Sequence, residues 1–363
     1  MSELQTTKIT NRAGTGSPNF SQGLKISGTD SGLLAPTRTE GDTQPDALTS
    51  SNGDTFYDTV NDTYDILIEG AWVRVLGAGG AAGIAWGGDR GVIGGGLTTV
   101  NVNVIAYFDI TTTGNATDFG DLTVARSAAG GLSNSSRGVF AGGGSTNVID
   151  YITIATPSNA IDFGDLLGNS DSAVGVCDGS RGVIWRSTGS LEYISVDTTG
   201  NSTSFGTIFG SAYNAGWNDS TRAIFSQGSG GNTMRYVTIQ TTGDATTFGT
   251  LTASRQRLAG CGDDTYAVFG GGENNVGGGN SNILDYVTIQ TTGNATDFGD
   301  LLSATQRPAA TSNGTLGCWA GGEISSNTNV IQYVTIASPG NATDFGDLTH
   351  AVGFATGLSG GAA

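Results

Sequence analysis

Pairs of acidic side chains are the groups in this sequence that most readily suggest chemistry. Two aspartates three positions apart flank a Phe-Gly at four places: Asp118 and Asp121, Asp162 and Asp165, Asp297 and Asp300, Asp344 and Asp347. A glycosidase places two carboxyl groups across one bond, whereas a calcium ion binds clustered oxygens. Catalysis seldom requires four copies of a pair, so the repetition favours turn residues that accept backbone hydrogen bonds. A calcium site is the alternative, although no EF-hand or nonapeptide loop supports it.

The remaining candidates form no catalytic or metal-binding set. His350 is the one histidine, so a His-rich metal site is excluded, and we expect it on a surface or turn. Cys177, Cys261 and Cys318 are odd in number and widely spaced, which predicts buried thiols rather than a disulfide framework. Gly-rich strings such as GGGENNVGGGNSN lack the lysine of a phosphate loop. We therefore predict no catalytic residue, no cofactor and no metal ligand.

Arginine, tryptophan and asparagine residues also recur at corresponding places. The arginines that open successive apolar segments are Arg90, Arg137, Arg181 and Arg222. They could bind anions in a channel, but we expect them to tie neighbouring segments through hydrogen bonds to carbonyls or carboxylates. Tryptophan can stack on sugars, yet we expect most of Trp86, Trp185, Trp217 and Trp319 in the core. The asparagines of the NAT and NST triplets are expected to be turn residues: Asn115, Asn201, Asn294 and Asn341.

The composition excludes several classes of partner. The 363 residues carry a net charge of -17, which repels phosphate backbones and argues against nucleic-acid binding. No apolar run approaches transmembrane length, so we expect no membrane insertion. The segment MSELQTTKITNRAGTGSPNF lacks the apolar region of a signal peptide. Together with the cysteine pattern, this predicts folding in a reducing compartment.

A repeated unit accounts for these recurrences. Six tyrosines are each followed, at one constant interval, by a Phe-Gly: Tyr107 and Phe119, Tyr151 and Phe163, Tyr193 and Phe205, Tyr236 and Phe248, Tyr286 and Phe298, Tyr333 and Phe345. A short apolar segment such as RGVFAGGG precedes each tyrosine, and the distance between the two differs from unit to unit. One loop per unit therefore changes in length. The period of about 41 to 50 residues is typical of propeller blades.

Each period contains four candidate strands and no helical pattern. In the second unit they are SAAGGLS, RGVFAGG, VIDYITI and DFGDL, separated by polar or Gly-rich turns. In the third of these, Ile152 and Ile154 face one way, whereas Ile149 and Tyr151 face the other. A strand that is apolar on both faces must be covered on both faces. We therefore predict an all-β propeller, in which each blade lies between two neighbours.

The two ends of the chain are expected to complete the ring. Trp72 of AWVRVL precedes Arg90 by the interval that separates Phe119 from Arg137, and the chain ends at that same interval after Phe345. We predict seven four-stranded blades: residues 79–350 form six repeats, residues 51–78 supply three strands of the seventh, and residues 351–363 supply its last strand. The alternative is six blades with a separate N-terminal module, since Val60 stands where a tyrosine is expected. Residues 1–50 would form an extended arm.

The unit resembles a kelch repeat over roughly residues 80 to 350. The matching features are VFGGG at residues 268–272, Tyr286, Phe298 with Leu301, and Arg307, with Arg126 and Arg255 near the same place in other units. The sequence departs from kelch repeats in carrying Phe where they usually have Trp, and in WRS and SQG, which lack the full glycine pair. The resemblance implies a kelch-like β-propeller but no particular activity.

The segments TTGNATDFGDL and SRGVFAGGG resemble sequences of a propeller-like family of tailed-phage virion proteins, especially from marine and cyanobacterial phages. TTKITNRAGTGSPNFSQGLKI looks like the leader of phage tail-fibre proteins, and GDTFYDTVNDTYDILIEGAWVRV like a small β module common in them. The resemblance implies a non-enzymatic virion protein, made in the host cytoplasm: a tail fibre, an adhesin or a head decoration. Its implied partners are other virion proteins, through the arm, further copies of the chain, and a host-surface glycan or protein.

Two other functions stay open. One is a propeller hydrolase or lyase that acts on cell-surface polysaccharide, which would require one pocket of unrepeated acidic or basic groups. The other is a cellular kelch-like adaptor, to which the leader is poorly suited.

Recognition is expected where the repeat varies. In a four-stranded blade, the loops between the second and third strands share a face with the connections between blades, and the TTGNATDFG turns lie opposite. Variable loops on a rigid scaffold commonly build recognition sites. The candidate loops are residues 97–104, 273–282 and 323–329. The candidate binding residues in them and next to them are Asn101, Asn103, Asn274, Asn275, Asn280, Asn282, Asn327 and Asn329.

Overall fold

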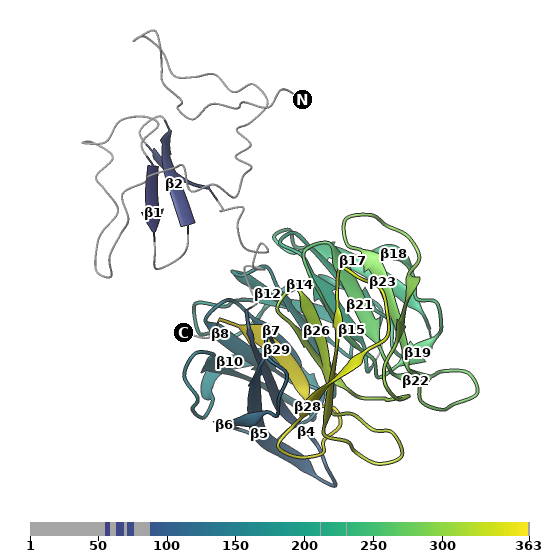
Figure 1. The fold of residues 1–363 in the computed structure, drawn as a ribbon. Helices are drawn as coiled ribbons and strands as arrows, with labels where there is room; N and C mark the ends of the chain where they lie inside the picture. Colours follow the sequence, from purple (N-terminus) through teal and green to yellow (C-terminus); the bar gives the residue numbers. More distant parts are fainter. Residues whose placement is uncertain are drawn as a thin grey trace. The chain divides into compact units, whose positions relative to one another are not determined.

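Six four-stranded sheets form a ring, and no helix occurs in the described residues (Figure 1). The computed structural model describes residues 88–210, 212–229 and 231–361, and the backbone of three strands between residues 55 and 75. All pairings within the blades are antiparallel, and the six innermost strands contact one another in a closed circle. The predicted all-β propeller is therefore confirmed.

The blades follow the chain, each described from its innermost strand outward. Blade 1 contains β29 (Thr356–Gly360), β4 (Arg90–Leu97), β5 (Asn101–Asp109) and β6 (Thr117–Asp121). Blade 2 contains β7 (Gly130–Ser133), β8 (Arg137–Ala141), β9 (Thr146–Thr153) and β10 (Ile161–Ser170). Blade 3 contains β11 (Ala173–Cys177), β12 (Arg181–Arg186), β13 (Ser190–Ser195) and β14 (Thr203–Thr207).

The second half of the ring repeats this order. Blade 4 contains β15 (Ala215–Asn218), β16 (Arg222–Ser226), β17 (Thr233–Thr238) and β18 (Thr246–Thr250). Blade 5 contains β20 (Ala259–Gly262), β21 (Tyr266–Gly270), β23 (Ile283–Thr288) and β24 (Thr296–Asp300). Blade 6 contains β25 (Ala309–Ser312), β26 (Leu316–Ala320), β27 (Val330–Thr335) and β28 (Thr343–Asp347). A short ribbon of β19 (Arg255–Gln256) and β22 (Glu273–Asn274) accompanies blade 5.

The ring closes within blade 1, where the last strand of the chain joins the first repeat. β29 runs antiparallel to β4, with Thr356 opposite Gly94 and Gly360 opposite Arg90. The first repeat begins at its second strand, so the C-terminus supplies the innermost strand, β29. With that strand every blade is complete at four strands. The prediction of seven blades was therefore wrong, and the alternative of six is confirmed.

The N-terminal strands form a sheet of their own. β1 (Thr55–Asp58), β2 (Thr63–Ile68) and β3 (Ala71–Val75) pair antiparallel in the order β1-β2-β3. This sheet belongs to a compact unit of residues 1–82, separate from the unit of residues 83–363. The strands predicted in residues 51–78 are thus present, but they supply no strand to a propeller blade. The arm predicted for residues 1–50 lies outside the described residues.

The hydrophobic core is divided among the interfaces between blades, because each sheet buries both of its faces. On β9, Ile149 packs in one cluster with Ile184 of blade 3. Ile152, on the opposite face of the same strand, packs in another cluster with Val92 and Leu358 of blade 1. The two-sided burial predicted from VIDYITI is confirmed.

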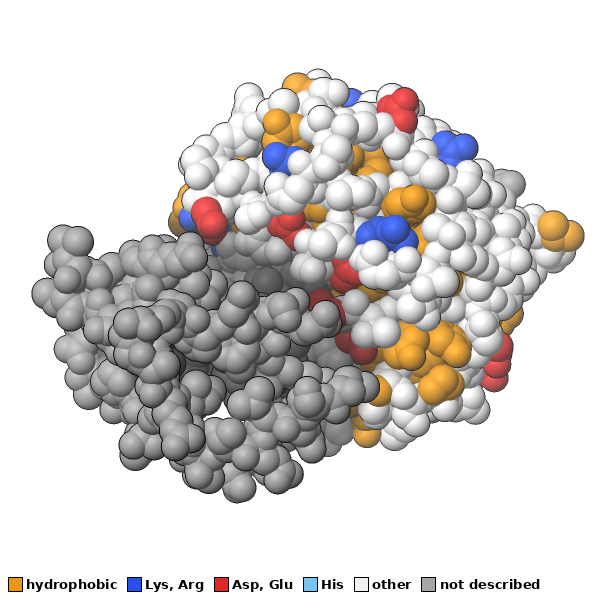
Figure 2. Space-filling view, turned by 90° about the horizontal axis from the view of Figure 1, so that it is seen from above, with side chains coloured by type: hydrophobic (Ala, Val, Ile, Leu, Met, Phe, Trp, Pro, Cys, Tyr) orange, Lys and Arg blue, Asp and Glu red, His pale blue; other side chains and the backbone are white. Residues whose placement is uncertain are grey.

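The surface is polar but sparsely charged. Figure 2 shows one face, on which Lys, Arg, Asp and Glu side chains are scattered among uncharged groups. This pattern agrees with a charged fraction of 13% for the chain. Among the described residues, no helix is long and apolar enough to cross a membrane.

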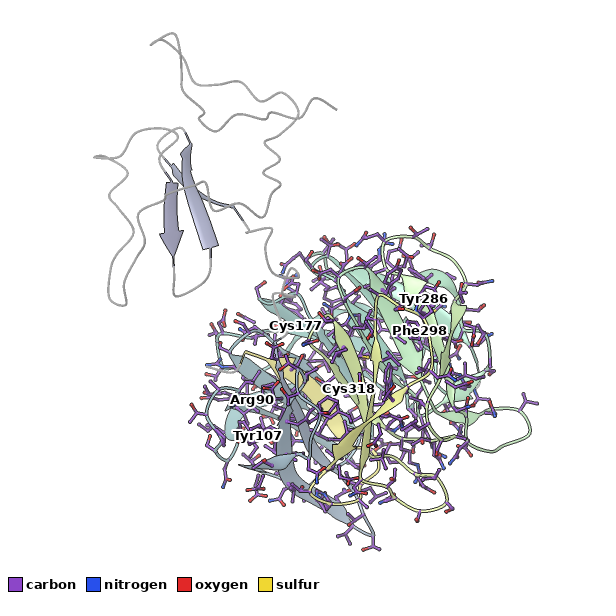
Figure 3. All side chains as sticks on the ribbon, viewed as in Figure 1. Arg90, Tyr107, Cys177, Tyr286, Phe298 and Cys318 are labelled. Atoms are coloured by element: carbon purple, nitrogen blue, oxygen red, sulfur yellow. The ribbon has the colours of Figure 1, made fainter. Side chains whose placement is uncertain are left out.

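The recurrent tyrosine and phenylalanine form a contact within every blade. The six pairs have ring centroids 5.7 to 6.3 Å apart in an edge-to-face arrangement, as for Tyr286 and Phe298 (Figure 3). In blades 1 to 4 an arginine lies over the tyrosine ring, 4.3 to 4.7 Å from its centre. Such contacts stabilise a core beyond the area that they bury.

The same four arginines join blades 1 to 4 each to the next blade. Arg90 donates a hydrogen bond to the carbonyl of Ile154 at 2.8 Å, and Arg137 to that of Val196 at 2.8 Å. Arg181 and Arg222 continue the series, donating to the carbonyls of Gln240 at 2.9 Å and Ile289 at 3.1 Å. The prediction that these arginines tie neighbouring segments is confirmed.

A second set of links runs around the rim and explains the Phe-Gly dipeptide. In each blade the pairing between the two outer strands shifts register at the Phe. The backbone N–H of the residue after the Gly then donates to a side chain in the turn of the next blade, as from Thr250 to Asn294 Oδ1 at 3.2 Å. The last link closes the circle, because Asp347 N–H donates to Asn115 Oδ1 at 3.0 Å. A Cβ on Gly249 would lie 1.8 Å from the Gly293 carbonyl oxygen, so the backbones approach too closely for any side chain.

Substitution of Gly249 by alanine should therefore destabilise the ring. The obstacle is backbone that cannot swing aside, so we expect a loss of about 2 to 3 kcal/mol in the free energy of unfolding. Gly293→Ala is the matched control, because a Cβ there meets nothing within 4 Å. It should stay within about 0.5 kcal/mol of the parent protein. Urea unfolding followed by tryptophan fluorescence measures both; equal losses would contradict the close approach.

Candidate functional site

One position of the repeat carries a different side chain in most blades, and it lies at the axis. The six residues at this position precede the innermost strands: Ala128, Ser172, Tyr213, Arg257, Arg307 and Phe354. We call them the channel mouth. They border a cavity of about 120 Å³, whose other walls are the Gly- and Ala-rich beginnings of the innermost strands. The mouth therefore combines a repeated backbone with unrepeated side chains.

Backbone hydrogen bonds connect the mouth residues in a belt. Phe354 N–H donates to the carbonyl of Arg307 at 2.9 Å, Arg307 to that of Arg257 at 2.8 Å, and Arg257 to that of Tyr213 at 2.9 Å. Five mouth residues, all except Ser172, have left-handed φ angles between 54° and 62°. At Ser172 the acceptor is the side-chain hydroxyl instead of the backbone carbonyl, since its Oγ accepts from Tyr213 N–H at 3.3 Å. Such strained backbone persists only where its surroundings hold it, and it is common at functional sites.

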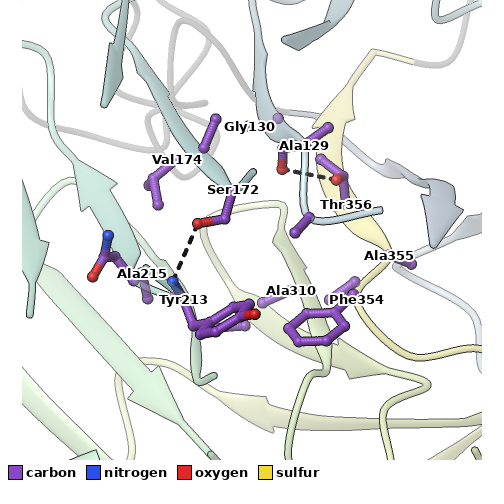
Figure 4. Close-up of a pocket in the computed structure, with 18 of the residues that line it drawn as sticks. Ala129, Gly130, Ser172, Val174, Tyr213, Ala215, Ala310, Phe354, Ala355 and Thr356 are labelled. Atoms are coloured by element: carbon purple, nitrogen blue, oxygen red, sulfur yellow. Dashed lines mark hydrogen bonds between the residues drawn. The ribbon is translucent and has the colours of Figure 1, made fainter. Parts of the chain in front are cut away.

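Two aromatic rings meet across the axis. Tyr213 and Phe354 belong to opposite blades, and their rings stack with centroids 5.1 Å apart and planes inclined by 27° (Figure 4). Arg257 lies over Tyr213, 5.0 Å from the ring centre, and Arg307 lies over Phe354 at 4.6 Å. The remaining two mouth residues, alanine and serine, are small. The mouth thus has one side rich in arginine and one side without large groups.

Each mouth arginine is paired with a glutamate from the variable loop of its own blade. Arg257 Nη1 bonds Glu273 Oε2 and also donates to Gln306 Oε1 at 3.0 Å. Arg307 Nη1 bonds Glu323 Oε2 at 2.5 Å. The four charged side chains are 20 to 26% exposed, so solvent screens them in part. Because the charges cancel within each pair, the mouth has positively and negatively charged groups but little net charge.

A groove of about 500 Å³ opens beside the mouth, between blades 6 and 1. Leu97, the last residue of β4, and Thr98 and Thr99 of the loop that follows line it on one side. Glu323, Ser326 and Asn327, from the loop between β26 and β27, line it on the other, together with Arg307 and Phe354 of the mouth. Asn327 bridges the two loops by donating Nδ2 to the carbonyl of Leu97 at 2.7 Å. Two of the three predicted recognition loops therefore form one site with the mouth.

The third predicted loop, residues 273–282, does not line the groove but is hydrogen-bonded to the loop of residues 323–329. Asn280 donates its Nδ2 to the carbonyls of Glu323 at 2.8 Å and Ile324 at 2.7 Å. Asn275 donates to Ser254 Oγ at 3.0 Å and to the carbonyl of Gly228 at 3.1 Å. The amides of these predicted binding residues thus hold the loops in place. Val276, at the tip, is 83% exposed.

The other predicted asparagines do not line the groove. Asn103, Asn282 and Asn329 occupy one repeat position, where each backbone carbonyl accepts from the leucine that follows the outermost strand. Asn101 is exposed at the start of β5, and Asn274 pairs with Arg255 in the small ribbon. Of the eight predicted asparagines, Asn327 lines the groove. A role of any of them in ligand binding stays a prediction.

The aspartate pairs are at the rim, on the outermost strands, whereas the mouth precedes the innermost ones. Their carboxylates were predicted to accept hydrogen bonds from the turn. Asparagine makes these bonds instead, since Asp121 N–H donates to Asn159 Oδ1 at 3.1 Å and Asp300 N–H to Asn341 Oδ1 at 3.1 Å. The prediction that the NAT and NST asparagines serve as turn residues agrees with this geometry. Within residues 88–361 as described, no group of three or more His, Cys, Asp or Glu side chains could hold a metal ion.

The single histidine, the cysteines and the described tryptophans are largely where they were expected. His350 is half-buried in a turn, where burial lowers its pKa. All three cysteines are buried and free, and burial raises their pKa, to about 12 for Cys318. Trp185 and Trp319 are fully buried, Trp217 is half-buried, and Trp86 lies outside the described residues.

The mouth and the charged pairs were missed in the sequence, although a signal for them exists. The mouth residue stands nine positions after the Phe of the Phe-Gly, as Arg307 does after Phe298, and eight positions after it in the case of Tyr213. Arg307 was grouped with Arg126 and Arg255 on the kelch resemblance. The structure separates them: Arg126 and Arg255 form buried ion pairs with Asp150 and Asp285, and they stand two positions before the mouth residues of their repeats.

Comparison with known proteins gives no family. No model of a known protein family matches the chain, and no curated protein matches it.

Proposed function

We propose that this chain is a structural protein of a tailed-phage particle and that its propeller displays a binding face. Three variable loops, a groove and the channel mouth lie together on one face of a scaffold whose blades are tied at the core and the rim. That concentration of unrepeated residues on a rigid frame is the observation that carries a binding function. The particle itself is proposed from the resemblance of the leader and the repeats to virion proteins. In this proposal, the N-terminal residues attach several copies to other virion proteins.

Localisation tests the first half of the proposal. Purified particles of the phage that encodes this chain would be labelled with antibodies against the propeller and viewed by electron microscopy. We expect label on the tail or on the head of intact particles. Absence of the chain from purified particles, judged by mass spectrometry of the same preparation, would contradict a virion role.

Exchange of the variable loops tests the second half. Replacing residues 97–104 and 323–329 by the short connection of blade 3 should remove binding to host cells, by at least tenfold in bound protein. Exchange of a rim turn, residues 111–116 (TTTGNA), for the corresponding turn of blade 2, residues 155–160 (ATPSNA), serves as the control and should leave binding intact. Fluorescence-based counting of labelled protein on cells measures both. Retained binding after the loop exchange would locate recognition elsewhere.

A propeller enzyme acting on cell-surface polysaccharide is the second candidate. The observation that favours it is the cluster of two neighbouring ion pairs, Arg257–Glu273 and Arg307–Glu323, which occur in blades 5 and 6 at one end of the channel. Both glutamates are engaged by arginine, which suits charge balance better than proton transfer. Release of reducing or unsaturated ends from host polysaccharide, lost in Glu323→Gln, would favour the enzyme over the display protein.

A further inference from the structure

We propose that the groove between blades 1 and 6 binds a neutral, hydroxyl-rich saccharide. The proposal deepens the display function above and rests on it, because the saccharide would be the surface ligand that the displayed face recognises. The volume of the groove, about 500 Å³, is within the range of roughly 300 to 1,000 Å³ found for small-ligand sites.

The lining supplies both halves of the hydrogen bonds that sugars need. A sugar hydroxyl is at once a donor and an acceptor, so its site must offer both kinds of group. Arg307 offers donors, the Glu323 carboxylate offers acceptors, and the hydroxyls of Thr99 and Ser326 offer either. The Thr98 hydroxyl donates to the carbonyl of Val100 at 3.2 Å, so it offers an acceptor. Phe354 adds apolar ring edge to the lining, because Tyr213 stacks on its ring and Arg307 lies over it.

The key donor is held in place before any ligand arrives. The Arg307 guanidinium lies over the Phe354 ring, and its Nη1 bonds Glu323. Its Nη2 forms no hydrogen bond with the described part of the chain, and its backbone is fixed in the belt around the mouth. A ligand that bonds this group does not have to restrict a flexible side chain, which favours affinity.

The charge pattern selects a neutral ligand. Arg307 and Glu323 cancel one another, and the other groove residues are uncharged. The chain as a whole carries a net charge of -17, which disfavours the approach of uronates or sialylated sugars. A neutral saccharide does not experience this repulsion and needs no charged partner in the lining.

Blade 5 offers a matched control for this site. Arg257 repeats the ring contact, the glutamate partner and the place in the belt, but it does not line the groove. A second side chain, Gln306, accepts from its Nη1 at 3.0 Å. The two arginines therefore differ mainly in their access to the groove.

The test uses saturation-transfer NMR and calorimetry on the full chain. The probes are glucose, galactose, mannose and N-acetylglucosamine, with their disaccharides, and glucuronate and sialic acid as charged counterparts. We expect binding of at least one neutral sugar, weakened at least tenfold in Arg307→Gln and less than twofold in Arg257→Gln. Thr99→Val, on an exposed loop, keeps the fold and should weaken binding severalfold.

Three results would overturn the inference. They are no binding of any neutral probe, preferred binding of the charged sugars, and equal losses in Arg307→Gln and Arg257→Gln. If no sugar binds while loop exchange still abolishes attachment to host cells, the display function stands and the saccharide site does not. If the protein binds neither sugars nor cells, both fail.

Discussion

A chain that ends at Ala355 is expected to lose its folded ring. It lacks β29, the innermost strand of blade 1, which pairs with β4 from Thr356 to Gly360. Ser359 Oγ donates to the Ser312 carbonyl at 2.5 Å on one side, and Ser133 Oγ donates to the Ser359 carbonyl at 2.6 Å on the other. Leu358 is also lost from the core between blades 1 and 2. Its loss alone is worth about 2 to 5 kcal/mol, which is a large part of the stability of an ordinary domain.

Near-ultraviolet circular dichroism and calorimetry measure the outcome. The shortened chain should show no cooperative thermal transition above room temperature, and it should aggregate, because the edge of β4 is then unpaired. Removing Ala362 and Ala363 alone is the control and should leave the transition almost unchanged. Addition of a peptide of residues 351–363 should restore part of the native signal. A shortened chain with an unchanged transition would show that closure does not depend on β29.

The blades could be predicted because their determinants lie close together in the sequence. Tyr286 and Phe298 belong to neighbouring strands, and their contact recurs in every blade. The same local signal predicted the arginine ties, since Arg222 opens its strand beside a tyrosine. Repetition made each of these patterns visible in several copies.

Closure could not be predicted in the same way, because it joins the two ends of the propeller and occurs once. A C-terminal inner strand was expected, but two partners were available for it: the N-terminal strands and β4. Spacing alone favoured Trp72, which precedes Arg90 by the interval that separates Phe119 from Arg137. The first repeat lacks an innermost strand of its own, and β29 fills this position by pairing with β4.

The candidate site was predicted in its loops and missed in its centre. Loop length identified residues 97–104 and 323–329, part of which lines the groove. Arg257, Tyr213 and Phe354 were overlooked, and Arg307 was assigned to a different set, since no repeated side chain marks their position. Their meeting depends on the circle, which brings together side chains from opposite blades.

The buried pair of Arg255 and Asp285 is expected to be the most sensitive side-chain contact. Both side chains are completely buried, and Arg255 Nη2 lies 2.5 Å from Asp285 Oδ2. Arg255 Nη1 also donates to the carbonyls of Gly271 at 2.5 Å and Ile283 at 2.8 Å. Burial lowers the pKa of Arg255, and Asp285 opposes that shift. The carboxylate therefore offsets part of the cost of removing the guanidinium from water.

Arg255→Met should lower the free energy of unfolding by about 3 to 5 kcal/mol, because it leaves a buried carboxylate without its cation. Arg257→Met is the matched control two residues away. Its ion pair with Glu273 is partly exposed, so its loss should cost about 1 kcal/mol or less. Urea unfolding of the three proteins, followed by tryptophan fluorescence, gives the comparison.

The double variant Arg255→Met, Asp285→Leu separates the charge from the packing. Removing the carboxylate as well takes away the uncompensated charge, so the double variant should recover most of the stability that Arg255→Met loses. Thr252, whose hydroxyl donates to Asp285 Oδ1 at 2.5 Å, limits the recovery because it loses its acceptor. A double variant as unstable as the sum of both single changes would mean that the side chains act independently. In that case shape, rather than charge pairing, would make this position indispensable to blade 5.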